Sequence, residues 1–116
     1  MRTELSSGTA VELVHPPSGP SVRGLVVIPD VMGMRPLFDR LVARLAAENN
    51  WSVAAFELYP GREHLEVADR LATASQLDDD RVLGDAMAAA DLNGGGTFDV
   101  LGFCMGGMYT LKAVDT

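Results

Sequence analysis

Apolar residues along this chain form short continuous runs separated by stretches with helical spacing. Residues 24–28 and Trp51–Phe56, the second with Ser52 as its single polar residue, are apolar runs without alternation, which is typical of strands buried on both faces of a parallel sheet. Ala10–Val14 alternates weakly and predicts an earlier strand. A further strand is predicted at residues 97–101, directly after three consecutive glycines. The strand pattern therefore predicts a buried sheet.

Helical spacing appears between these strands. Five apolar residues recur at this spacing after the first buried run: Leu37, Phe38, Leu41, Val42 and Leu45. They predict an amphipathic helix over residues 36–48 that begins at a proline and stops at Asn49-Asn50. Residues 65–77 are expected to hold a helix, and a clearer one starts at the aspartates 78–80, whose charges favour a helix N-terminus. Residues 108–113 predict the start of a final helix.

The order of these elements predicts an α/β fold. Strands alternate with helices after Gly24, which indicates a mostly parallel sheet with helices on both faces. The 116 residues form one domain at most, over residues 1–116, with 47% hydrophobic and 22% charged residues. That balance is ordinary for a globular protein and argues against disorder.

Charge and cysteine content exclude several classes of function. The net charge of −7 leaves no basic stripe to bind phosphates, so we expect no nucleic-acid partner. For the same reason no membrane partner is expected, and the longest apolar run, Leu25 to Ile28, is too short to cross a bilayer. The single cysteine excludes an intrachain disulfide and a multi-cysteine metal site. A lone thiol and an N-terminus without an apolar signal segment favour the cytoplasm.

The candidate chemistry lies in the segment Gly102-Phe103-Cys104-Met105-Gly106-Gly107. A strand, a Gly-x-nucleophile-x-Gly turn and a helix form the nucleophile elbow of α/β-hydrolases, here with cysteine in place of serine. Gly102 and Gly106 let strand and helix approach closely, and the N–H of Met105 would point at an oxyanion. The dipole of the following helix would favour the thiolate. The alternative is a buried, inert cysteine in a glycine-rich turn.

A second candidate segment, residues 28–33, follows the first buried strand. In an α/β-hydrolase this loop supplies the other oxyanion N–H, which would be that of Val31. Asp30 would then lie near the sulfur of Cys104. Alternatively, Asp30 is a solvent-exposed cap of the helix that begins at Pro36. The local sequence does not separate these two interpretations.

The groups that would activate Cys104 are not evident in this sequence. In an α/β-hydrolase the acid and the histidine follow the nucleophile, but His15 and His64 both precede Cys104. Asp115 is too close to the nucleophile to serve as the acid. We therefore expect residues 1–116 to be the N-terminal portion of an α/β-hydrolase domain that lacks its C-terminal strands. This portion alone should turn over little or nothing.

Three segments resemble the dienelactone hydrolase family: the elbow at residues 102–107, the loop at residues 26–33 and Phe56-Glu57-Leu58-Tyr59-Pro60. The resemblance covers the chain but only the first half of a family member. It implies hydrolysis of a small-molecule ester or lactone, with carboxymethylenebutenolidase as the type activity and without a metal or organic cofactor. The substrate can bear a carboxylate, which family members hold with arginine.

The same resemblance assigns roles to individual residues. It implies Cys104 as the nucleophile, with the N–H groups of Val31 and Met105 as oxyanion donors. Asp30 stands where the family usually has a glutamate that contacts the resting cysteine. Glu57 stands where the family usually has aspartate, and no role is carried onto it.

Other assignments stay open. Arg62, Arg70 and Arg81 lie between the second buried strand and the elbow, and each is more often a surface charge than a substrate ligand. The chain is alternatively a non-catalytic half-domain whose open edge strand pairs with a partner chain. A thiol-dependent binding or redox module of flavodoxin-like topology is a further alternative, and it requires an accessible Cys104. The oligomeric state is not predicted.

Overall fold

The computed structural model describes residues 1–17, 19–21, 23–62, 65–93 and 98–114. Along these ranges the elements are, in chain order, β1 (Arg2–Glu4), β2 (Ala10–Val14), β3 (Arg23–Ile28), α1 (Pro36–Asn49), β4 (Trp51–Phe56), α2 (Val67–Leu71), a 3-10 helix (Ala74–Gln76), α3 (Asp79–Leu92), β5 (Asp99–Gly102) and α4 (Met105–Val114). None of the described helices combines the length and the apolar character needed to cross a bilayer.

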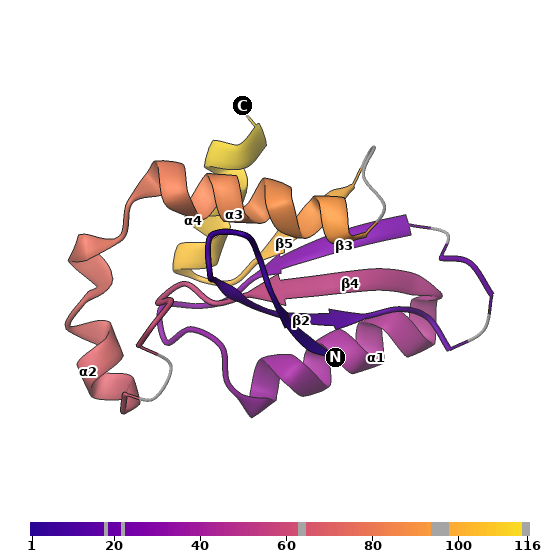
Figure 1. The fold of residues 1–116 in the computed structure, drawn as a ribbon, viewed down its shortest axis with the longest axis horizontal. Helices are drawn as coiled ribbons and strands as arrows, with labels where there is room; N and C mark the ends of the chain where they lie inside the picture. The colour runs from indigo at the N-terminus through magenta and orange to yellow at the C-terminus, as the bar shows by residue number, and fades with distance from the viewer. Residues whose placement is uncertain (18, 22, 63–64, 94–97, 115–116) are drawn as a thin grey trace.

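The strands form one mixed sheet in the order β1-β2-β4-β3-β5 (Figure 1). β3 pairs in parallel with β4 and with β5, as the alternation of strands and helices after Gly24 predicts. β2 joins β4 antiparallel, and β1, which has no counterpart among the predicted ranges, joins β2 antiparallel. Within the described residues, β5 therefore lies at one edge of the sheet.

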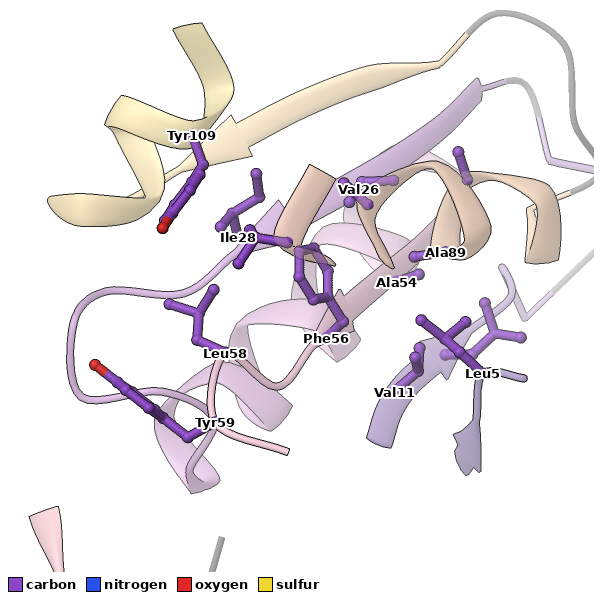
Figure 2. Close-up of a cluster of buried hydrophobic side chains, with 14 residues drawn as sticks. Leu5, Val11, Val26, Ile28, Ala54, Phe56, Leu58, Tyr59, Ala89 and Tyr109 are labelled. Atoms are coloured by element: carbon purple, nitrogen blue, oxygen red, sulfur yellow. The ribbon is translucent and has the colours of Figure 1, made fainter. Parts of the chain in front are cut away.

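The central strands are buried on both faces because helices cover both sides. Val26 and Ile28 of β3 belong to one core cluster, whereas the intervening Val27 belongs to the other. This alternation is the two-residue period of a strand. α1 packs against one face through Phe38 and Val42. α3 and α4 lie over the opposite face, where Figure 2 shows the cluster that contains Val26 and Ile28. The prediction of helices on both faces is confirmed.

Helix boundaries follow local signals closely. α1 starts at Pro36, and Asn50 ends it in a left-handed conformation with φ of 59°. α3 starts directly after Asp78, whose side chain accepts a hydrogen bond from the N–H of Asp80. The helix expected within residues 65–77 is present only as α2 and the separate 3-10 helix. The predicted strand start at Thr97 and the three glycines before it lie outside the described residues.

Candidate active site

Cys104 is the second residue of the two-residue connection between β5 and α4. Phe103 links Gly102 to Cys104, and its N–H donates to the Ile28 carbonyl at 3.2 Å, which extends the β3–β5 pairing up to the turn. Cys104 has φ of 56°, a left-handed conformation that is unusual for a residue with a side chain. Its side chain is exposed, which contradicts the alternative of a buried cysteine. The local geometry is therefore that of a sharp strand-to-helix turn carrying an accessible thiol.

The Met105 amide lies at the N-terminus of α4. The Cys104 carbonyl accepts hydrogen bonds from the N–H groups of Gly107 at 2.9 Å and Met108 at 3.4 Å. Met105 is the first residue of α4, and the first amides of a helix have no acceptor within it. α4 thus begins three residues earlier than its predicted range. A Cβ at Gly107 would lie 3.7 Å from the Gly102 carbonyl, an ordinary contact, so close packing does not require glycine there.

Asp30, Val31, Met32 and Gly33 form a tight turn after β3. The Gly33 N–H donates to the Asp30 carbonyl at 2.9 Å, and the Met32 N–H donates to Oδ1 of Asp30 at 3.1 Å. Gly33 has φ of 75°, which glycine adopts without strain. The hydroxyl of Tyr59 donates to the Val31 carbonyl. None of these bonds engages the Val31 N–H.

The sheet register brings this turn and the Cys104 turn to the same end of the strands. Ile28 at the end of β3 is paired in parallel with Gly102 at the end of β5. Val31 follows Ile28 by three residues, and Met105 follows Gly102 by three residues. The two candidate oxyanion amides therefore emerge from neighbouring parallel strands at their carboxyl ends, where ligands of open α/β sheets bind.

Asp30 is engaged by Arg35. The two carboxylate oxygens accept from the two terminal guanidinium nitrogens of Arg35 at 2.8 and 2.9 Å, a bidentate pair. The hydrogen bond from Arg35 is the main reason that the pKa of Asp30 is lowered. Arg35, not Asp30, occupies the N-cap position of α1, and the Asp30 side chain is 17% exposed and paired with Arg35, so the solvent-exposed cap alternative is wrong. The contact between Asp30 and the Cys104 sulfur stays a prediction.

Aromatic contacts connect the two turns. The guanidinium of Arg35 lies over the Phe38 ring, 5.2 Å from its centroid. Phe38 in turn meets the ring of Phe103 edge-to-face, with centroids 5.6 Å apart. Phe103 immediately precedes Cys104. The Asp30–Arg35 pair and the elbow are thus parts of one packed unit.

Glu57 and Arg70 are buried polar residues that contact the loop after β3. Neither of them was assigned this role from the sequence. Glu57 Oε2 accepts from the Met34 N–H, and Arg70 donates to the Met34 carbonyl, each at 3.0 Å. Arg70 is 6% exposed, so its interpretation as a surface charge is wrong. A glutamate immediately after a strand in which Ser52 is the single polar residue was the available signal for Glu57, because a buried carboxylate needs donors from its surroundings.

The histidine that the structure describes lies at the opposite end of the strands from Cys104. His15 follows β2, whose Val14 pairs with Val53 near the amino end of β4. Its Nδ1 is 2.8 Å from the hydroxyl of Ser52, which donates to Asn93. Cys104 lies instead at the carboxyl ends of β3 and β5, so this histidine is placed away from the thiol. His64 and Asp115 lie outside the described residues.

Two other arginines lie beside a cavity of about 220 Å³ at the start of α3. Arg81 is held by Asp85 at 3.2 Å and by the Leu58 carbonyl at 2.6 Å. Arg62 lines the same cavity and is partly exposed. Within the described ranges, no group of three or more His, Cys, Asp or Glu side chains is arranged to hold a metal ion.

Comparisons with known proteins agree with this architecture. The model of the dienelactone hydrolase family matches residues 10–115. A Klebsiella pneumoniae subsp. pneumoniae protein assigned as a dienelactone hydrolase aligns at 23% identity with a TM-score of 0.76. A dienelactone hydrolase-like promiscuous phosphotriesterase from metagenomic libraries aligns at 19% identity with a TM-score of 0.77. Each alignment covers 97% of this chain and 52% of the other, so the chain spans about half the length of these structures. Among curated proteins, none matches this sequence.

Proposed function

This chain belongs to the dienelactone hydrolase family, and we propose that it supplies the nucleophile and the oxyanion donors of a cysteine-dependent carboxylic ester or lactone hydrolase. The observation that carries the proposal is Cys104 at φ of 56°, exposed between β5 and α4. A non-glycine residue persists in that conformation only where the surrounding structure enforces it, and such positions cluster at functional sites.

The chemistry follows from the groups around this turn. The Cys104 thiolate attacks the carbonyl carbon of the ester, and the carbonyl electrons move onto its oxygen. The N–H groups of Val31 and Met105 stabilise that oxyanion. When the tetrahedral intermediate collapses, the C–O bond breaks, the alcohol leaves with a proton, and a thioester on Cys104 remains. Water then cleaves the thioester and releases the acid.

The proton transfers in this cycle need a base near the sulfur. His15 lies near the amino end of β4, at the other end of the strands from Cys104, and no histidine follows Cys104 in the sequence. We infer that the histidine and its orienting acid come from outside these 116 residues. Thiolate attack can still occur at alkaline pH, but hydrolysis of the thioester should be slow. The 116 residues alone therefore acylate once and turn over little.

The substrate class is a small ester or lactone, and a carboxylate-bearing one is favoured by Arg62. Of the three arginines between β4 and β5, Arg70 is buried against Met34 and Arg81 is held by Asp85. Arg62 lines the same cavity as Arg81, and its side chain is partly exposed. It is the arginine of this stretch best placed to meet a substrate carboxylate.

Acylation of Cys104 tests the proposal directly. The chain is treated with p-nitrophenyl acetate at alkaline pH, and the product is examined by mass spectrometry. We expect one acetyl group on Cys104, removable by hydroxylamine as a thioester requires, and no such adduct in Cys104→Ala. Modification spread over lysines, with Cys104 unlabelled, would refute the proposal.

A second candidate, a half-domain that pairs with a strand-supplying partner chain, is favoured by β5, which lies at an edge of the sheet in the part of the chain that the structure describes. Leu101, Met108 and Leu111 are exposed on β5 and α4, and Leu111 is 74% exposed. Exposed apolar side chains beside a free strand edge favour association. Analytical ultracentrifugation distinguishes the two: concentration-dependent association supports pairing, whereas a stable, folded monomer contradicts it.

A further inference from the structure

Three buried side chains support the turn that carries the Val31 amide. Tyr59 and Glu57 are each 1% exposed and Arg70 is 6% exposed. All three reach the loop between β3 and α1 from the segments that follow β4. Tyr59 belongs to the same buried cluster as Phe56 and Ile28, and Figure 2 shows it beside Leu58 at the margin of that cluster.

The hydrogen bonds of the turn determine where the Val31 N–H points. The peptide between Val31 and Met32 is held at both ends, because its carbonyl accepts from the Tyr59 hydroxyl and its N–H donates to Asp30. In the preceding peptide, the Asp30 carbonyl accepts from the Gly33 N–H inside the turn. A trans peptide points its C=O and N–H in opposite directions. The Val31 N–H is therefore directed out of the turn.

Glu57 ties Tyr59 to the same loop. Its Oε1 accepts from the Tyr59 N–H at 3.1 Å, and its Oε2 accepts from the Met34 N–H at 3.0 Å. Arg70 holds the carbonyl of the same Met34. Gly33 is required between these groups, because a Cβ there would lie 2.4 Å from Glu57 Oε1. The hydroxyl of Tyr59 thus approaches Val31 from a fixed position.

We propose that Tyr59 is a positioning residue for the oxyanion site: its hydroxyl fixes the Val31–Met32 peptide so that the Val31 N–H is presented to the substrate oxyanion. This inference rests on the proposed function. Burial of the phenol, and then the charge of Glu57, raises the pKa of Tyr59, so its hydroxyl remains a donor at the alkaline pH at which thiolates react. Preorganised donors of this kind require no rearrangement when the oxyanion forms.

Two reagents separate oxyanion stabilisation from thiol reactivity. Acylation by p-nitrophenyl acetate passes through an oxyanion, whereas alkylation by iodoacetamide does not. Both rates at Cys104 are measured at one pH for the 116-residue chain and for Tyr59→Phe. We expect Tyr59→Phe to slow acylation about tenfold and to change alkylation less than about twofold, since it removes support for one donor only.

Tyr109→Phe is the matched control. Tyr109 is also a buried tyrosine whose pKa burial raises, but its hydroxyl bonds to Asp79 on α3 and not to the loop after β3. We expect both rates to stay within about twofold of the parent. Intact folding of each variant is checked by far-UV circular dichroism and by Trp51 fluorescence.

A double variant tests the route through Val31. Val31→Pro removes the N–H itself at the second position of a turn, which tolerates proline. In that background, Tyr59→Phe should slow acylation less than about twofold further. Equal losses for both reagents, no loss for either, or a full tenfold loss in the Val31→Pro background would each overturn the inference. A parent chain that is not acylated at Cys104 would overturn the proposed function as well, whereas an acylated parent with an unaffected Tyr59→Phe variant overturns this inference alone.

Discussion

Substitution of Gly33 by alanine should destabilise this protein well beyond the usual effect of losing a glycine. Gly33 has φ of 75°, and a Cβ at this position would lie 2.4 Å from Glu57 Oε1 and 3.1 Å from Cδ2 of Tyr59. Glu57 and Tyr59 are both buried, so neither side chain has solvent into which it can move. The added methyl group must therefore displace the carboxylate or the turn itself.

The magnitude follows from two separate contributions. Placing alanine in the left-handed region costs about 1 kcal/mol. Moving Glu57 Oε1 breaks its hydrogen bond with the Tyr59 N–H and leaves a buried donor unpaired, which costs about 2 kcal/mol. We therefore expect Gly33→Ala to lower the free energy of unfolding by about 3 kcal/mol. Gly8 is a matched control, because its φ is 91° and no atom lies within 4 Å of a Cβ there. Gly8→Ala should cost only the backbone contribution of about 1 kcal/mol.

Urea unfolding measures both variants against the parent chain. Trp51 is the single tryptophan and lies at the start of β4, so its fluorescence reports on the sheet. For a typical urea dependence of about 2 kcal/mol per molar, Gly33→Ala should lower the midpoint by about 1.5 M and Gly8→Ala by about 0.5 M. Equal losses in the two variants would show that Glu57 does not confine Gly33, and would refute the reasoning.

Two further substitutions test the candidate site. Cys104→Gly should be about 1 kcal/mol more stable than Cys104→Ala, because glycine adopts the φ of 56° without strain, and thermal unfolding of the pair measures the difference; an alanine variant of equal or greater stability would contradict this. Asp30 has a folded-state pKa below its ordinary value of 3.8, so its pairing with Arg35 stabilises the fold above about pH 4 and is lost as the pH falls through that lowered pKa. The stability difference between the parent and Asp30→Asn should therefore shrink between about pH 4 and pH 2 in denaturant titrations, and a difference that does not change with pH would argue against the ion pair.

Features determined by neighbouring residues were predictable from the sequence. Residues 24–28 and Trp51–Phe56 are buried strands, and α1 starts at Pro36 and ends before Asn50, as the apolar pattern and the end signals predict. The β5–Cys104–α4 order was also predictable, because a strand, a tight turn and a helix are specified within a few consecutive residues. The catalytic roles of Cys104, Val31 and Met105 stay predictions.

Features that depend on which segments become neighbours were decided only by the tertiary structure. Asp30 pairs with Arg35 rather than capping α1, because the turn at Gly33 folds residue 35 back onto residue 30. Arg70 is buried because α2 lies against the loop that contains Met34, a contact between segments 36 residues apart. His15 lies at the opposite end of the strands from Cys104 because β2 runs antiparallel to β4. Periodicity along the chain specifies which face of an element is apolar, but the sheet order and register decide which polar groups come into contact. In this protein those contacts form the candidate site.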